Sequence, residues 1–351
     1  MNVRDATRSY ERWLSKQTAV VKNDLQEKHA LMRRSAFEFL RATFYRWVQL
    51  WPAECPELAE APSLLGVGDL HLENFGTWRD TEGRLIWGIN DMDEAHPVAY
   101  TSDLVRLATS AVLAIRNREL RVTGRTACDA ILDGYEDAIN RGGQPIVLAE
   151  RRRWLRRIAI RQLQEPDKFW KELTLQHTAR GHLPHEALRT LLPAGVEYRV
   201  IARTAGIGSL GRPRFVAIAE WGGAKIAREA KALIPSAAAW AAESKATTTF
   251  IADLHSRAVR IPDPFYTVAD KWVVRRLAPD CTKIEMSDLP EELYETKLLR
   301  AMGWETGNVH LANDVSAVTG DLSNRPKSWL RNSAERMADV VAHDWRDWRS
   351  G

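Results

Sequence analysis

The sequence predicts an α+β fold in which a small β-rich part of the chain is inserted between two helical parts. Three observations indicate this order. Apolar residues recur every three or four positions in residues 1–50, which is the spacing of an amphipathic helix. From residue 196 to residue 279, short apolar runs are bounded by glycines and polar residues, as strands are. From residue 290 to residue 348 the helical pattern returns, with many tryptophans and charges.

The first helical part is interrupted by a segment whose hydrophobic pattern is not helical. Proline-containing residues 51–62 break the initial helical pattern. Between residues 64 and 94, short apolar runs alternate with polar clusters, which predicts strands that end in functional loops. Helical periodicity then resumes over residues 101–157, with Ser102 as the expected N-cap. We therefore divide the chain into a helical part (1–190), a β-rich part (195–285) and a second helical part (288–351).

Composition limits the class of protein. A length of 351 residues suggests about two domains. With 45% hydrophobic and 27% charged residues, the chain has the composition of a soluble globular protein and not of a disordered one. Lysine and arginine total 50 against 46 acidic residues, so the net charge is only +4. We therefore do not expect a nucleic-acid partner.

Cysteine usage and hydropathy indicate the compartment. Cys55, Cys128 and Cys281 are widely spaced and odd in number, which favours neither a disulfide framework nor a structural zinc site. The charged first residues lack the apolar core of a secretory signal. No run of about 18 uncharged apolar residues occurs. We expect a cytoplasmic protein with no membrane association.

A glycine-rich loop is the first candidate binding motif, and it consists of Gly206, Gly208, Ser209 and Gly211. A dinucleotide-binding loop of this pattern leads into a helix, whereas Pro213 and a strand-like run follow here. Strand, glycine loop, strand is the arrangement that covers the phosphates in protein kinases. The glycines taken alone fit a plain turn equally well.

A lysine on the next strand would supply the positive charge that a triphosphate needs. Lys225 and Lys231 are the candidates, with Arg228 between them as a further cofactor-binding candidate. Residues 225, 227, 229 and 231 share one face if the strand is extended. Lys231 precedes a predicted helix that contains Glu243, which predicts a Lys231–Glu243 ion pair like that of kinases. A solvated lysine is the alternative for either position.

The strongest cluster is a pair of polar loops after apolar runs. Asp69 and Asn74 are five residues apart, as the aspartate and asparagine of the kinase catalytic loop are. In that chemistry the carboxylate orients the attacking hydroxyl and accepts its proton, and the amide oxygen binds magnesium. Asp91 follows Asn74 by seventeen residues, where a second metal-binding carboxylate belongs. Asp93 and Glu94 add further oxygen ligands. Capped turns in solvated loops are the alternative.

The same loop allows another interpretation. Asp69 and His71 resemble the first ligands of a two-metal phosphoesterase, and His71 is therefore a second candidate catalytic residue. That site would need further ligands, for which His310 is a candidate in a helical context, and surface positions are expected for three other histidines, His177, His182 and His185. The basic run 151–157 fits a phosphate-binding patch or, preferably, a solvated helix face.

Seven segments of the chain together resemble the bacterial family called domain of unknown function 2252. They are SAFEFLRATFYRW, GVGDLHLENFG, GINDMDEAHP and SDLVRLATS, followed by AGIGSLGRPRFVAIAEW, AREAKALIPSA and VVRRLAPD. The resemblance covers most of the chain. It implies a bilobal fold like those of protein kinases and aminoglycoside phosphotransferases, in circularly permuted order, with a small antiparallel β-rich lobe and a larger helical lobe.

The resemblance also implies roles for individual residues. Asp69 would be the catalytic carboxylate, Asn74 and Asp91 would bind Mg²⁺, and Lys231 would contact the phosphates of ATP. Val67-Gly68 replaces the His-Arg that precedes the kinase aspartate, and no glycine follows Asp91-Met-Asp93 as in the kinase metal loop. These departures favour a small-molecule hydroxyl acceptor over a protein. A pseudokinase-type regulator, a nucleotidyl transferase and a metal-dependent phosphohydrolase remain the alternatives.

Overall fold

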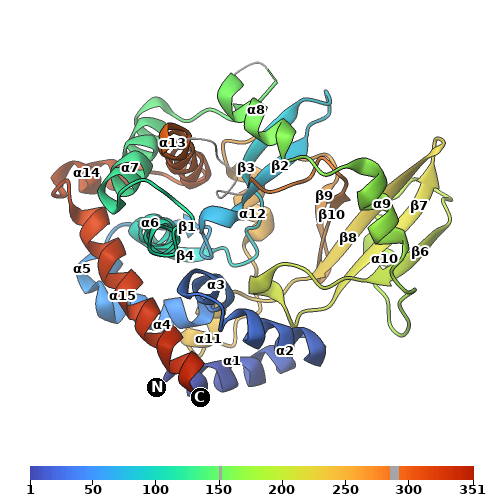
Figure 1. The fold of residues 1–351 in the computed structure, drawn as a ribbon, viewed down its shortest axis with the longest axis horizontal. Helices are drawn as coiled ribbons and strands as arrows, with labels where there is room; N and C mark the ends of the chain where they lie inside the picture. The colour runs from blue at the N-terminus through green and yellow to red at the C-terminus, as the bar shows by residue number, and fades with distance from the viewer. Residues whose placement is uncertain (150–151, 285–291) are drawn as a thin grey trace.

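The computed structural model describes residues 1–149, 152–284 and 292–351. Over these residues the fold is mixed α+β, with 15 α-helices and small antiparallel sheets. Helices gather on one side of the molecule, and a five-stranded sheet extends from the other side (Figure 1). Among the helices in the described ranges, none combines the length and apolar character needed to cross a bilayer.

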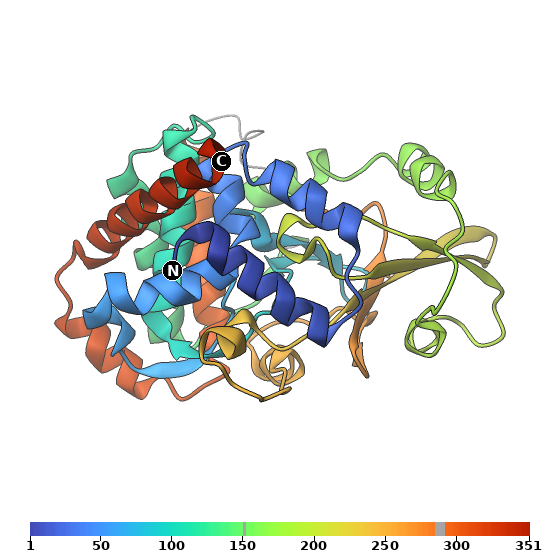
Figure 2. The ribbon, with the colours of Figure 1, turned by 90° about the horizontal axis from the view of Figure 1, so that it is seen from below.

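The N-terminal region is helical, as the sequence predicts, and forms α1 (Val3–Gln17), α2 (Lys22–Leu31), α3 (Ala36–Ala42), α4 (Phe44–Glu54) and α5 (Pro56–Ala59). Side chains cap two of these helices: Asn2 accepts a hydrogen bond from the Asp5 amide, and Ser35 accepts one from the Glu38 amide. Helix α4 continues through Pro52, so the predicted break begins later than expected. In Figure 2 these helices reach from the helical side toward the sheet.

Two small sheets follow and place two polar loops together. Strand β1 (Ser63–Gly66) pairs with β4 (His96–Ala99). Strand β3 (Leu85–Ile89) pairs with β2 (Phe75–Arg79) and β5 (Ile146–Val147). The segment between β1 and β2 (67–74, the Asp69 loop) ends in a 3₁₀ turn, Leu72–Asn74. It lies beside the segment between β3 and β4 (90–95, the Asp91 loop), because the Asn90 amide donates to the Asn74 carbonyl at 2.9 Å.

Helices from both ends of the chain form the main core. They are α6 (Tyr100–Arg116), α7 (Gly124–Arg141), α13 (Glu292–His310), α14 (Ser316–Asn324) and α15 (Trp329–Ser350). Helices α7 and α13 approach closely at two glycines: a Cβ on Gly134 would lie 2.0 Å from the Arg300 carbonyl oxygen, and one on Gly303 would lie 1.9 Å from that of Ile131. Ser102 does not cap α6, which begins at Tyr100; its hydroxyl instead accepts from the Trp47 indole at 3.2 Å.

The five-stranded sheet has the order β6-β7-β8-β10-β9 and is antiparallel throughout. Its strands are β6 (Tyr198–Ala202), β7 (Arg214–Trp221), β8 (Ala224–Ala232), β9 (Tyr266–Ala269) and β10 (Trp272–Leu277). One face packs on α9 (Pro166–Thr174) and the other on α10 (His185–Arg189). The two remaining helices after β8 are α11 (Ala237–Ala241) and α12 (Ile251–Arg257).

The basic run leads into α8 (Arg153–Arg161), with Arg152 as the N-cap and Arg151 outside the described residues. Leu155, Ile158 and Ala159 are buried, while Arg153, Arg156 and Arg157 are exposed. The solvated-face interpretation of this segment is therefore confirmed.

Candidate active site

A cavity of about 320 Å³ lies where the Asp69 loop, the Asp91 loop and the segment between β6 and β7 (203–213, the glycine loop) meet helices α2 to α4. Most of the candidate site residues line it, namely Asp69, His71, Asn74, Asp91, Asp93, Gly206, Gly208 and Ser209. The two loops and the glycine loop are far apart in sequence, so the structure confirms that the fold brings these motifs together.

Asp69 is bound to a buried arginine. Its Oδ1 accepts from Nε of Arg106 at 3.0 Å and also from Nη2. Arg106 is fully buried on α6 and donates to the Leu40 carbonyl oxygen at 2.9 Å as well. Burial raises the pKa of Asp69 above its usual value, and the charge of Arg106 opposes that rise. The arrangement fixes the carboxylate through one oxygen, while the other lies close to Gly208 of the glycine loop.

A buried acid holds the backbone that presents Asp69. The carboxylate of Asp103 accepts from the amides of Val67 at 2.6 Å and Gly68 at 2.9 Å, and from Nε2 of His310 at 3.0 Å. His310 in turn contacts the Tyr135 hydroxyl through Nδ1 at 2.9 Å. Both ring nitrogens of His310 are therefore occupied, and the residue is not among those that line the cavity. It does not provide the extra metal ligand that the phosphoesterase interpretation needs.

Asn74 joins the two polar loops through all of its amide atoms. Its Nδ2 donates to the carbonyl oxygens of Asp69 at 3.1 Å and Asp91 at 2.8 Å. Its Oδ1 accepts from the Asp91 amide at 2.9 Å. Only this orientation of the side-chain amide satisfies both carbonyls and the amide, so the polar network assigns it. Asn74 therefore sets the distance between Asp69 and Asp91.

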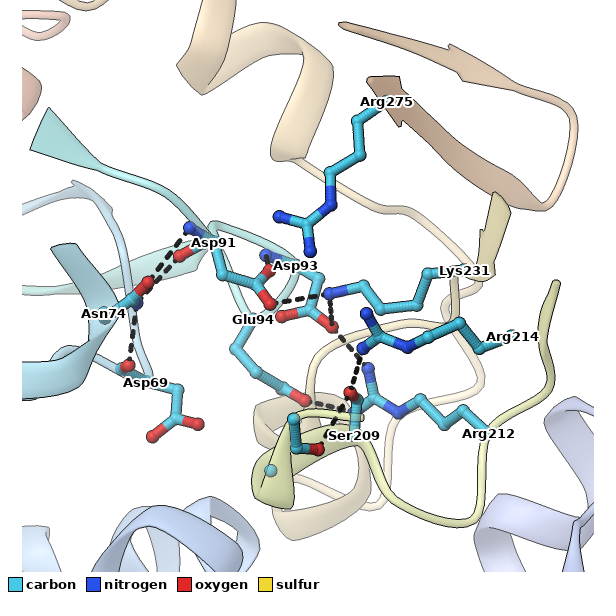
Figure 3. A network of polar contacts seen from close by, with 12 residues as sticks. Asp69, Asn74, Asp91, Asp93, Glu94, Ser209, Arg212, Arg214, Lys231 and Arg275 are labelled. Carbon is cyan, nitrogen blue, oxygen red and sulfur yellow. Dashed lines mark hydrogen bonds and ion pairs between the residues drawn. The ribbon is translucent and has the colours of Figure 1, made fainter. Parts of the chain in front are cut away.

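Lys231 meets the two aspartates of the Asp91 loop (Figure 3). Its Nζ lies 2.7 Å from Asp91 Oδ2 and 3.1 Å from Asp93 Oδ2. Although burial opposes ionisation, the charge of Lys231 holds the pKa of Asp91 well below its usual value. Burial and the neighbouring Asp91 charge raise the pKa of Asp93 to about 6. The predicted Lys231–Glu243 pair is wrong, because Lys231 pairs with the two aspartates.

Arg212 supports the same loop from the glycine-loop side. Its guanidinium donates to Asp93 Oδ2 at 2.7 Å through Nη1 and to Glu94 Oε1 through Nη2. Glu94 uses its other oxygen to accept from the Ala237 amide at 2.7 Å. Glu94 is thus committed to protein contacts through both of its carboxylate oxygens.

The glycine loop packs against the N-terminal helices. A Cβ on Gly208 would lie 3.1 Å from the Arg41 carbonyl oxygen and 3.2 Å from Asp69 Oδ2. Gly211 has a φ of +97°, and a Cβ there would lie 2.4 Å from Leu25. Lys28 of α2 donates to the Gly208 carbonyl oxygen at 3.0 Å, and burial lowers the pKa of this lysine to about 8. Strand, glycine loop, strand is confirmed, and the glycines allow this close approach to Asp69.

The cavity face of the sheet carries a charged cluster that the sequence did not reveal. Glu229 is fully buried and accepts from Arg214 at 2.8 Å, from Arg275 at 2.9 Å and from Arg203. These three charges hold the pKa of Glu229 well below its usual value, against the effect of burial. Glu229 and Lys231 lie on the same face of β8. The alternation of side chains along a strand was therefore the sequence signal that could have indicated this cluster.

His71 is buried and neutral. Burial and the nearby positive charge of Arg41 lower the pKa of its ring well below the usual value. Its Nδ1 accepts from the Glu73 amide at 3.2 Å, so the ring proton is on Nε2. In this state His71 is a hydrogen-bond donor at the cavity and does not act as a base.

Three candidate cofactor-binding residues lie away from the cavity. Lys225 is exposed at the start of β8. Arg228 points to the opposite face of the sheet from Lys231, where it donates to the Leu191 carbonyl oxygen at 2.8 Å and packs on Phe265. Glu243 is exposed beyond the end of α11. Of the two candidate lysines, therefore, Lys231 is the one at the site.

Asp91 and Asp93 are the candidate ligands for a magnesium ion. Mg²⁺ prefers one or two carboxylates together with phosphate oxygens and water. Asp91 lines the cavity with a side chain that is 40% exposed, and Asp93 lies beside it. Asn74 Oδ1 already accepts the Asp91 amide, so its role as a direct ligand stays a prediction. Asp91 and Asp93 are the residues that would hold the ion.

Comparisons with known proteins give one match. No curated protein and no solved structure matches the chain. The family model described as "Uncharacterized protein conserved in bacteria (DUF2252)" matches residues 20–180, which contain the Asp69 and Asp91 loops and the helices around them. This is the family that the sequence segments resemble. Residues 20–180 of the chain are therefore similar to the DUF2252 family of uncharacterised bacterial proteins.

Proposed function

We propose that this protein is an ATP-dependent phosphotransferase that transfers a phosphoryl group to a hydroxyl group of a small-molecule acceptor. One observation carries the proposal. A buried lysine from a central strand lies within hydrogen-bond distance of Asp91 and Asp93, and Asp69 lines the same cavity. Phosphoryl transfer depends on this combination of a fixed lysine, metal-binding carboxylates and a carboxylate for the attacking hydroxyl.

Asp69 has the surroundings of a proton acceptor. Arg106 fixes one of its oxygens, so the other is oriented and remains available to an acceptor hydroxyl. Its raised pKa makes it a stronger base than an exposed aspartate. Asn74 fixes the spacing of Asp69 from the Asp91 loop, where a bound Mg²⁺ would neutralise charge on the transferred group. Lys231 would stabilise the phosphates beside it.

The order of the parts supports a circularly permuted protein-kinase-like arrangement. The Asp69 and Asp91 loops precede the glycine loop and Lys231 in the chain, which is the reverse of the kinase order. The permuted order is physically consistent, since the C-terminal helix α13 packs on α7 and α15 packs on α6. The β-rich part is thus an insertion in the sequence, and the helical segments before and after it pack together into one body.

A nucleotide-binding regulator is the second candidate. One observation favours it: every polar atom of the Asn74 amide is committed to the two loops and not to a metal. Such a protein would bind MgATP through Lys231 and Asp91 but would not transfer a group.

Binding and transfer separate these candidates. Thermal unfolding with ATP, ADP, GTP and AMP, each with and without Mg²⁺, should show stabilisation by MgATP. Candidate acceptors are then incubated with γ-labelled or α-labelled ATP. A labelled product from γ-labelled ATP alone supports the phosphotransferase. Label from the α position indicates nucleotidyl transfer, and binding without any product supports the regulator.

Asp69→Asn provides the residue-level test. It should abolish transfer and keep MgATP stabilisation, while Asp339→Asn, an exposed carboxylate outside the cavity, should change neither. Full turnover by Asp69→Asn would disprove the assigned role. Absence of stabilisation by every nucleotide would remove both candidates together.

A further inference from the structure

The cavity face of the five-stranded sheet bears a row of positive charges. Strand register places Arg214 opposite Lys231 and Arg275 opposite Glu229. Arg203 follows β6 and its amide donates to the Arg214 carbonyl oxygen at 2.9 Å, so it extends the row. The three arginines line the cavity, whereas Glu229 lies behind them and is fully buried. Glu229 therefore positions the arginines and is itself shielded from the cavity.

The formal charges of these side chains form two neighbouring groups. Three arginines share the single carboxylate of Glu229, which leaves an excess of two positive charges. Beside them, Asp91, Asp93 and Glu94 share Lys231 and Arg212, which leaves an excess of one negative charge. A ligand that carries both phosphate groups and a divalent cation would match this division.

The arginine side chains on this face suit a phosphate group better than a nucleotide base. A guanidinium presents five N–H donors in a planar fork that matches phosphate oxygens. The side chains of Arg203 and Arg275 remain 31% and 25% exposed after they bind Glu229. Purine bases need mainly apolar or aromatic surfaces with a few polar atoms. A wall of guanidinium groups does not provide such a surface.

We propose that Arg203, Arg214 and Arg275 form an anion subsite that binds a phosphate group of the ligand and not its base. The subsite rests on the proposed function and specifies it, because it places polyphosphate against the sheet. The phosphate has two possible sources: the polyphosphate of the nucleotide or a phosphate group already present on the acceptor.

Inorganic tripolyphosphate is the direct probe, because it has the charges of the nucleotide without base or sugar. Calorimetric titration of the full chain with tripolyphosphate should show saturable binding that weakens with added salt. Arg203→Gln and Arg275→Gln should each weaken that binding at least about tenfold, the range expected for one lost charge-assisted contact. Arg300→Gln, which removes an arginine paired with Asp133 and Asp137 outside the cavity, is the control.

Arg203 is the most exposed of the three arginines, so its variant should fold, and unfolding without ligand verifies this. Absence of tripolyphosphate binding, or equal binding by all variants, overturns the subsite. If MgATP still binds and transfers its phosphoryl group, the proposed function survives that failure. If tripolyphosphate binds through the arginines but no nucleotide does, the subsite stands and the proposed function fails.

Competition identifies the source of the phosphate. If saturating tripolyphosphate prevents MgATP from binding, the arginines hold the phosphates of the nucleotide. If both bind together, the arginines hold a phosphate of the acceptor. Either result supports the subsite, and adenosine binding that depends on Arg203 and Arg275 would contradict it.

Discussion

Lys231 Nζ donates to Asp91 Oδ2 at 2.7 Å across 140 residues of sequence. The contact joins a central strand of the five-stranded sheet to the Asp91 loop on the helical side. Lys231 is nearly buried, and its charge holds the pKa of Asp91 below its usual value. Each group therefore affects the other: the lysine lowers the pKa of a carboxyl that lines the cavity, and the two aspartates hold the lysine beside the Asp91 loop.

Lys231→Met should therefore remove both the proposed phosphate contact and the charge that lowers the pKa of Asp91. We expect phosphoryl transfer to fall by roughly 10²–10³-fold, the usual loss for one electrostatic contact to a developing charge. Stabilisation by MgATP should fall as well. Lys225→Met is the matched control, since Lys225 lies on the same strand and face but is exposed outside the cavity. Rate measurements and thermal unfolding would show equal effects of the two changes if the assignment were wrong.

Arg106→Gln should move the pH dependence of transfer. The positive charge of Arg106 lowers the pKa of Asp69 against the effect of burial, so its removal raises that pKa further. Asp69 must be ionised to accept a proton, and the acid limb of the pH–rate profile should shift to higher pH. Breaking a buried ion pair should also cost about 3–5 kcal/mol of stability.

Arg46→Gln separates these two effects. Arg46 forms another buried pair, with Asp344, away from the cavity. Its loss should cost similar stability and leave the pH profile in place. The role of Arg106 as a positioning residue for Asp69 would be refuted by an unshifted acid limb in Arg106→Gln.

The candidate site was predictable where local sequence decides the position. Asp69, Asn74, Asp91 and Asp93 follow short apolar strands, and loops at the ends of neighbouring strands lie together whatever the rest of the chain does. The glycine loop was predictable for a similar reason, because Pro213 excludes a helix at that point.

Contacts that depend on register and on helix length were not predictable. Glu229 meets Arg214 and Arg275 because β8 lies between β7 and β10 in one register, and a single-residue slip would turn Glu229 to the opposite face. The expected Lys231–Glu243 pair failed because α11 ends at Ala241, which leaves Glu243 in solvent. No local pattern encodes either outcome.

Glu229→Gln should destabilise the protein most at neutral pH. A carboxylate whose folded-state pKa lies well below its unfolded value of 4.5 binds fewer protons when folded. Its contribution is fully present above about pH 4.5 and is lost as the pH falls through the folded-state pKa. At pH 7 the substitution leaves three arginines around a neutral group, at a cost of about 3–5 kcal/mol.

The difference in unfolding free energy between wild type and Glu229→Gln should therefore narrow below about pH 4.5. Urea unfolding of both proteins at neutral pH and at about pH 3.5 measures it. Glu220→Gln, on the exposed end of β7, should remain close to wild type at both pH values. A difference that stays constant or widens on acidification would contradict the arginine cluster around Glu229.

Gly208→Ala tests whether the glycine loop closes over Asp69. The new Cβ would lie 3.1 Å from the Arg41 carbonyl oxygen and 3.2 Å from Asp69 Oδ2, which is tighter than ordinary contact. The loop should shift by a few tenths of an ångström. Since a misplacement of about 1 Å can cost 10²-fold in rate, we expect roughly a tenfold loss of transfer with little change in stability.

Gly320→Ala, in the open interior of α14, should leave transfer intact and gain about 0.5–1 kcal/mol in unfolding free energy. Full transfer by Gly208→Ala would mean that this loop does not form the cover of the reacting groups.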